Sequence, residues 1–188
     1  MTFLSSRKIF TALGLALLLN SPVKADNCQI SVSPGDISFG SIKKEESVTS
    51  RHNIHRFQRK EAIVSVFCQH ETQAAIFVNS LSGERGGILF GDRSRLAVTV
   101  DSLSVDGYPA DIAKTKDREN FTQQTSRIEK IVVLNNEGFY AIKDAKSMKG
   151  KQFMAKLIVT PLISDAQFRS IRDNTQLESH MELELITR

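Results

Sequence analysis

Tryptophan is absent from this chain of 188 residues, and cysteine occurs only twice, as Cys28 and Cys68. Of the four histidines only His52 and His55 lie close together. Because side chains three positions apart on a strand face opposite sides, this spacing does not favour a metal site. No serine or cysteine stands in a recognisable nucleophile motif. We therefore expect neither an enzyme nor a resident cofactor or metal.

Long apolar runs are also lacking, with one exception at the start of the chain. Two basic residues precede an apolar run over residues 9–19, and the small residue Ala25 closes the segment. The run is shorter than the roughly 20 residues that a membrane-spanning helix needs, and the order basic, apolar, small is typical of a cleavable signal peptide. We predict a signal peptide over residues 1–25 and one exported domain over residues 26–188.

Without the predicted signal peptide, the chain has no marked excess of positive or negative charge. The full chain carries 25 Lys and Arg against 21 Asp and Glu, and three of the basic residues lie in the predicted signal peptide. The mature net charge is therefore near +1. A domain that binds nucleic acid would show a clustered positive field, so we expect no nucleic-acid partner.

Export also bears on the two cysteines. An oxidising compartment favours a disulfide, so we predict a bond between Cys28 and Cys68, with two separate buried thiols as the alternative. On a chain-entropy estimate, a bond that closes a loop of this length stabilises the fold by about 4 kcal/mol.

Apolar residues with a period of two are abundant, which is typical of half-buried strands. The first such segment, residues 28–39, is interrupted by Pro34-Gly35, which predicts a bend. Residues 62–68 and 74–79 are expected to pair as a hairpin. Asp106-Gly107 predicts a tight turn between strands at 96–101 and 108–112.

The second half of the chain continues the pattern. Residues 113–127 are polar and are expected to form a loop. Strands at 127–134 and 139–142 flank a turn sequence, which predicts a second hairpin. Further strands are expected at 153–160, ending at Pro161, and at 177–187, with one helical turn near 166–171. About seven short strands, turn signals between them and a cysteine pair near the start predict an all-β, immunoglobulin-like β-sandwich.

With these strands and cysteines, the chain resembles the subunits of bacterial chaperone–usher pili (fimbriae). The resemblance rests on a Cys-x-Ile-x-Val-x-Pro-x-x-Ile-x-Phe-Gly arrangement over residues 28–40 and on the apolar strand 63–67 before the second cysteine. It also rests on the two closing strands, 153–161 and 177–185, and it extends over essentially the whole mature chain.

The resemblance implies a sandwich that lacks its final strand and has a hydrophobic groove between the first and last strands. A periplasmic chaperone fills such a groove transiently, and a donor strand of a neighbouring subunit replaces the chaperone at the outer-membrane usher. The alternative is that the same residues are ordinary core residues of a complete sandwich. By position, the groove residues are Ile30, Val32, Ile37, Phe39, Met181, Leu183 and Leu185.

The sequence departs from the family pattern in two ways, and these departures indicate which kind of subunit to expect. Only Asp26 and Asn27 stand between the predicted signal peptide and Cys28, where ordinary subunits carry a donor extension. The closing residues 185–188 also lack the penultimate aromatic residue that is typical of many subunits. We therefore expect a subunit that accepts a donor strand but provides none, which is a minor or tip subunit with a role in cell adhesion.

A basic segment with one aromatic residue lies between the first two predicted strands. A protein at a fimbrial tip could use it to bind a host-surface receptor such as an anionic glycan or glycolipid, and the alternative is a solvated connection without a ligand. The residues of this candidate ligand patch are Arg51, Arg56, Phe57, Arg59 and Lys60.

The leading hypothesis is thus a non-enzymatic fimbrial subunit that is exported through the periplasm to the cell surface. The alternative is a self-contained secreted or periplasmic immunoglobulin-like binding module that does not polymerise. An exported enzyme is the third and weakest option.

Overall fold

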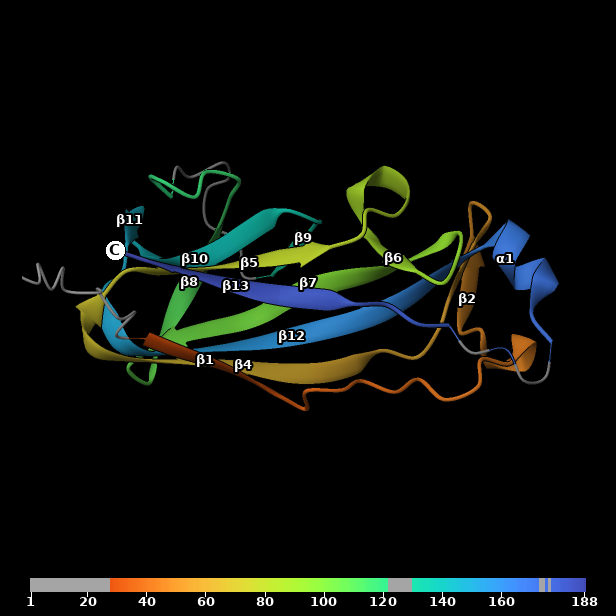
Figure 1. Cartoon of the computed structure of the whole chain (residues 1–188), viewed down its shortest axis with the longest axis horizontal. Coiled ribbons are helices and arrows are strands. Elements are labelled where there is room, and N and C mark those ends of the chain that lie inside the picture. Colours follow the sequence, from red (N-terminus) through yellow and green to blue (C-terminus); the bar gives the residue numbers. More distant parts are fainter. Residues whose placement is uncertain (1–27, 122–129, 173–174, 176) are drawn as a thin grey trace, which may run out of the picture.

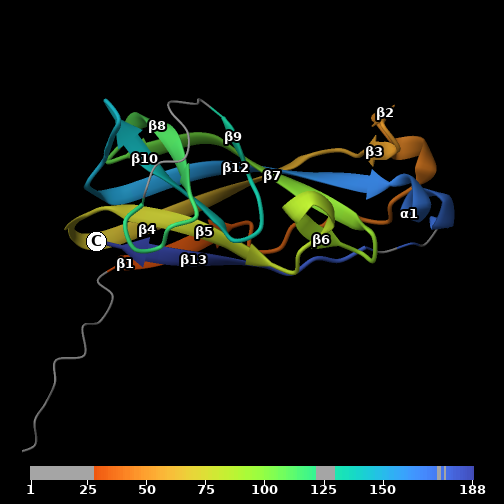
Figure 2. The same ribbon diagram turned by 90° about the horizontal axis from the view of Figure 1, so that it is seen from above.

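The computed structural model describes residues 28–121, 130–172, 175 and 177–188. In this part of the chain thirteen antiparallel strands form one sheet that is nearly closed into a barrel (Figures 1 and 2). The predicted all-β class is confirmed. The predicted signal peptide and the two residues that follow it lie outside the described residues.

Eight strands form the main path of the sheet, and β1 and β13 are its two ends. The path is continuous because β8 pairs with β7 through residues 108–110 and with β10 through residues 111–115. Hydrogen bonding therefore runs from one half of the molecule into the other. In order along the path, the strands are β1 (Cys28–Ser33), β4 (Lys60–Thr72), β12 (Gly150–Ser164), β7 (Ser94–Val105), β8 (Tyr108–Thr115), β10 (Glu137–Lys143), β5 (Ala74–Ser80) and β13 (Met181–Thr187).

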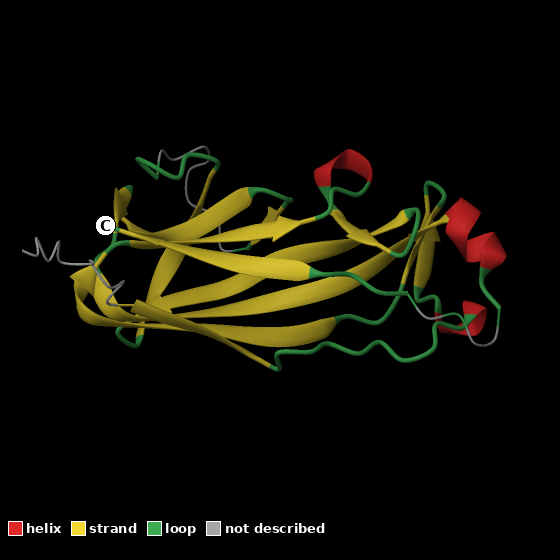
Figure 3. Cartoon of the chain, in the orientation of Figure 1, coloured by secondary structure: helices red, strands yellow, loops and turns green. Residues whose placement is uncertain are grey.

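The remaining elements are short and attach to this path. Figure 3 shows the helical segments outside the body of strands, with α1 at the end of the molecule remote from the C-terminus. The elements are β2 (Thr49–Arg51), β3 (Ile54–Arg56), β6 (Ile88–Phe90), β9 (Ile131–Val133), β11 (Lys146–Ser147), the 3-10 turns η1 (Lys44–Glu46) and η2 (Glu84–Gly86), and the helix α1 (Asp165–Ser170).

The main core lies between the inward faces of these strands. Along most of β12 and β7 every second residue is buried, as the period of two predicts. β5 differs, because five successive residues, 74–78, are buried. Ile76 and Val78 face the main core, whereas Phe77 belongs to a second cluster with Phe121 and Tyr140 on the other side of the strand. A continuous apolar run is what a strand covered on both faces requires.

The predicted hairpin of residues 62–68 and 74–79 is wrong. β4 pairs with β1 and β12, whereas β5 pairs with β10 and β13. Between them the chain crosses from one side of the barrel to the other at Gln73, whose backbone N–H and C=O both bond to Arg188, at 2.8 and 2.9 Å. Two adjacent apolar strands therefore belong to different parts of the sheet.

The predicted hairpin around residues 135–138 is also wrong. β9 pairs with β7, and β10 pairs with β8, β5 and β11. The expected strand end at Pro161 is wrong as well, since β12 runs on to Ser164. Pro161 is tolerated because it lies where β12 changes partner, after the pair Val159↔Lys60 with β4 and before Leu162↔Arg56 with β3.

Three local predictions are confirmed. The chain leaves the sheet after Ser33, so the bend at Pro34-Gly35 ends β1. Asp106 and Gly107, with φ of 50° and 83°, form the two-residue turn between β7 and β8. Helix α1 begins where the Ser164 hydroxyl accepts a hydrogen bond from the N–H of Gln167.

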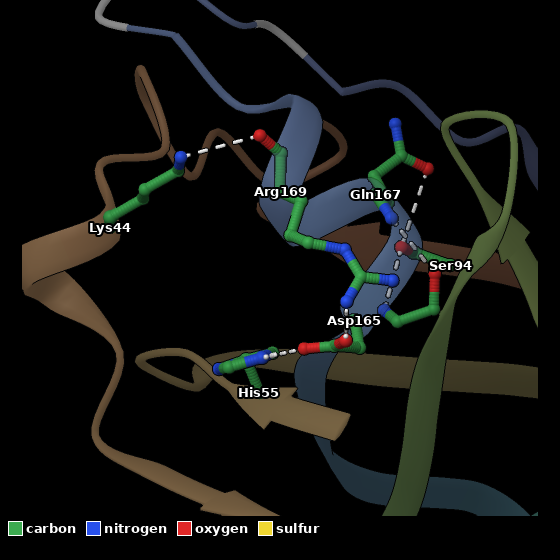
Figure 4. Close-up of polar contacts among 7 residues, drawn as sticks. Lys44, His55, Ser94, Asp165, Gln167 and Arg169 are labelled. Atoms are coloured by element: carbon green, nitrogen blue, oxygen red, sulfur yellow. Dashed lines mark hydrogen bonds and ion pairs between the residues drawn. The ribbon is translucent and has the colours of Figure 1, made fainter. Parts of the chain in front are cut away.

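Helix α1 is attached to β3 and β7 by a polar cluster (Figure 4). His55 Nε2 lies 3.1 Å from Asp165 Oδ1, and the imidazole stacks on the Phe168 ring with 3.5 Å between centroids. The buried Gln167 accepts a hydrogen bond from the Arg93 N–H at 2.9 Å. His55 is thus half-buried and engaged, rather than part of a solvated loop.

Candidate functional site

β1 and β13, the two ends of the path, each have one edge without a partner strand among the described residues. Both strands lie on the same side of the molecule (Figures 1 and 2). Along a free edge, every second residue directs its backbone N–H and C=O away from the sheet, which makes the edge a template for a further strand.

A cleft of about 710 Å³ lies between the segment that continues β1 and the segment that leads into β13. Residues 35–41 form one wall and residues 177–181 the other, and Phe90, Leu96 and Val159 lie at its base. Phe39 packs edge-on against Phe90, with 5.9 Å between ring centroids.

Of the seven residues that the sequence places in a donor-strand groove, Ile37, Phe39 and Met181 line this cleft, and the other four lie on β1 and β13 beyond it. Each is only half-buried and packs against the main core from its rim. On β1 the inward side chains alternate with exposed ones, so the strand faces the core but is incompletely covered. In a closed sandwich the side chains of the two inner faces interdigitate and form the core. The predicted groove residues are Ile30, Val32, Ile37, Phe39, Met181, Leu183 and Leu185.

The disulfide between Cys28 and Cys68 is present, as predicted. The two cysteines are register partners at the start of β1 and near the end of β4. The bond therefore holds the start of β1 to β4, on the side of β1 opposite its free edge.

The other edge strand, β13, is held through its outer face. Glu184 accepts hydrogen bonds from Arg118 Nε at 3.0 Å and from Asn79 Nδ2 at 2.9 Å. These two bonds hold the pKa of the Glu184 carboxyl below its usual range. Arg118 in turn lies over the Phe77 ring, 4.3 Å from its centroid. These contacts hold the outer face of β13 and leave its free edge without a partner strand among the described residues.

The candidate ligand patch is not brought together as one surface. Phe57 is 6% exposed and packs near Phe168, so its ring belongs to the core and is removed from the accessible patch. Arg56 and Arg59 are exposed beside one groove, and Lys60 lines a separate pocket. Arg51 is the last residue of β2, and its side chain is outside what the structure describes.

The described residues contain neither a candidate metal site nor a candidate membrane-spanning helix. No group of three or more His, Cys, Asp or Glu side chains in this part of the chain could hold a metal ion. No described helix has the length and apolar character needed to cross a bilayer.

Comparison with known proteins adds no relative. No protein-family model matches the chain, and no curated protein matches it significantly.

Sequence reasoning missed the base of the cleft. Phe90 is the last residue of β6, and Leu96 lies in β7 opposite Ile88. The pattern places such residues inward, but it does not say which inward residues meet a gap. Only the order of the strands shows which side chains have no strand above them.

Proposed function

We propose that this protein is a non-enzymatic fimbrial subunit whose fold is an immunoglobulin-like sandwich lacking one strand. Its partners are a periplasmic pilus chaperone, an outer-membrane usher and a neighbouring subunit. Each of them contacts the free edges of β1 and β13, or the protein that covers these edges. The cell surface is its destination.

One observation carries the proposal. The inward apolar side chains of both edge strands remain half-buried at edges that no described strand covers, and a cleft lined by Ile37, Phe39 and Met181 continues from these edges. An added strand would form main-chain hydrogen bonds with a free edge and would cover alternate apolar side chains, which is how strand addition obtains affinity and specificity together. An exposed edge of this kind is otherwise an aggregation hazard.

The second candidate, a self-contained binding module, is favoured by the extent of the core. More than two dozen residues are buried in one cluster without any added strand. A chain of this kind would be stable alone, so the two functions differ in a property that can be measured.

We expect a self-complemented variant to be far more stable than the chain alone. In this variant a linker and a strand of alternating apolar residues follow Arg188, next to the end of β13. Covering three or four half-buried side chains should add about 5 kcal/mol, or roughly 15 °C in melting temperature. The measurement is the yield of soluble protein in a bacterial periplasm and its thermal unfolding.

The matched control carries the same linker and a strand with aspartate at the inward-facing positions. It should behave as the chain without a donor. If the unmodified chain accumulates as a soluble monomer and melts at the same temperature as the self-complemented one, the binding-module function holds instead.

We further propose that the subunit occupies the tip or another minor position, because predicted cleavage after Ala25 leaves too little chain before Cys28 for a donor strand. Mass spectrometry of the exported protein is then expected to give Asp26 as the first residue. A mature start that leaves an apolar segment before Cys28 would instead make the protein a donor as well as an acceptor.

A further inference from the structure

A shallow groove of about 510 Å³ crosses the solvent-facing side of β7 and β12. Its floor is formed by the paired residues Thr99↔Ile158 and Ala97↔Thr160. All four are half-buried although they point away from the main core. The connection from β3 to β4 lines one side, and the start of β9 lines the other.

The walls carry three cations and the groove holds one carboxylate. Lys130 Nζ lies 2.6 Å from Asp101 Oδ1, and this hydrogen bond, with the nearby charges of Lys130, Lys156 and Arg59, holds the pKa of Asp101 below its usual value. Lys130 therefore has its counter-ion. Within the part of the chain that the structure describes, the side chains of Arg56 and Arg59 make no hydrogen bond or ion pair.

The apolar part of the groove is aliphatic. Val48 and Val132 are 65% and 49% exposed, and Leu162 is half-buried between the two walls. The aromatic ring in the lining, Phe57, is turned into the core. The groove thus offers no flat ring on which a sugar or a base could stack, but it offers methyl groups for aliphatic side chains.

We propose that this groove binds an acidic peptide segment of a partner protein. Carboxylates of the segment pair with Arg56 and Arg59, and its aliphatic side chains cover Val48 and Val132. Arginine suits such a role because its planar guanidinium binds a carboxylate through two parallel hydrogen bonds. The groove lies on the outer face of β12, away from the cleft at the edge strands, so the inference does not depend on the fimbrial function.

The test is an NMR titration of the isotope-labelled mature chain with the peptide Glu-Ile-Glu-Leu-Glu. The chain is used with or without the donor strand, whichever form is soluble. Shifts are expected at backbone amides of residues 56–59, 97–101, 130–132 and 158–162. The double variant Arg56→Ala, Arg59→Ala should bind at least about tenfold more weakly, because both charge pairs with the peptide are lost.

The matched control is Lys143→Ala with Lys146→Ala, which removes two exposed positive charges from β10 and β11. It should bind as the parent does. The proposal is overturned by shifts that are absent or confined to β1, β13 and the cleft beside them, or by an equal loss in the control. It is also overturned by equal binding of Glu-Ser-Glu-Ser-Glu, or by tighter binding of an acidic oligosaccharide such as a hyaluronan fragment, which would assign the groove to a carbohydrate.

Discussion

Val32→Asp is expected to abolish the stabilisation that a donor strand provides. Val32 points inward from β1 at the free edge of the sheet and packs against the main core. A strand laid along that edge would enclose a carboxylate among apolar side chains, and an unpaired buried charge is costly enough to shift its pKa or to exclude the strand. The whole gain of about 5 kcal/mol should be lost.

The measurement is the free energy of unfolding of four proteins, with and without the donor strand and with and without the substitution, which together form a thermodynamic cycle. Comparing gains rather than melting temperatures removes any effect that the substitution has on the chain without a donor strand. Gln29→Asp serves as the control, because it introduces the same carboxylate on the same strand at an exposed position. If Val32→Asp leaves the gain intact, the donor strand lies elsewhere.

Replacing both cysteines, Cys28→Ser with Cys68→Ser, is expected to cost the self-complemented protein about 4 kcal/mol of its free energy of unfolding. The two bonded residues are 40 positions apart, so loss of the bond returns conformational freedom to the unfolded chain. It also leaves β1 attached to β4 by backbone hydrogen bonds and packing alone.

Urea-induced unfolding of the double variant and of the parent measures this cost. Reduction of the parent with a thiol should reproduce most of it, which separates the bond from the serine side chains. A difference below about 1 kcal/mol would mean that the unfolded chain is already compact around these residues.

Local sequence patterns were sufficient to predict most strands, one turn and part of the candidate donor-strand site. The alternation at Ile30 and Val32 and at Met181 and Leu183 placed these side chains inward, and the structure has them on the two edge strands. The turn at Asp106-Gly107 was predictable because few other residues accept its positive φ. These features depend on neighbours in the sequence, which is why the pattern contains them.

The pairing between strands was harder to predict from the sequence. β4 and β5 are adjacent and apolar, yet they belong to different parts of the sheet. The run of buried residues in β5 was visible, but its cause, a second cluster under Phe121, was not. The same holds for Phe57, which looks exposed within a basic run but is drawn into the core beside Phe168.

From the sequence alone we could infer that the protein is built of strands and which side chains of the first and last strands face inward, and we could predict the bond between its two cysteines. The packing of the whole chain was needed to show that these two strands end the sheet, with a cleft beside them, and that Arg56, Arg59 and Lys130 line one outer groove. The reason is physical. Alternation records burial at a single position, whereas strand order and the approach of residues distant in sequence depend on the free energy of the whole packed chain.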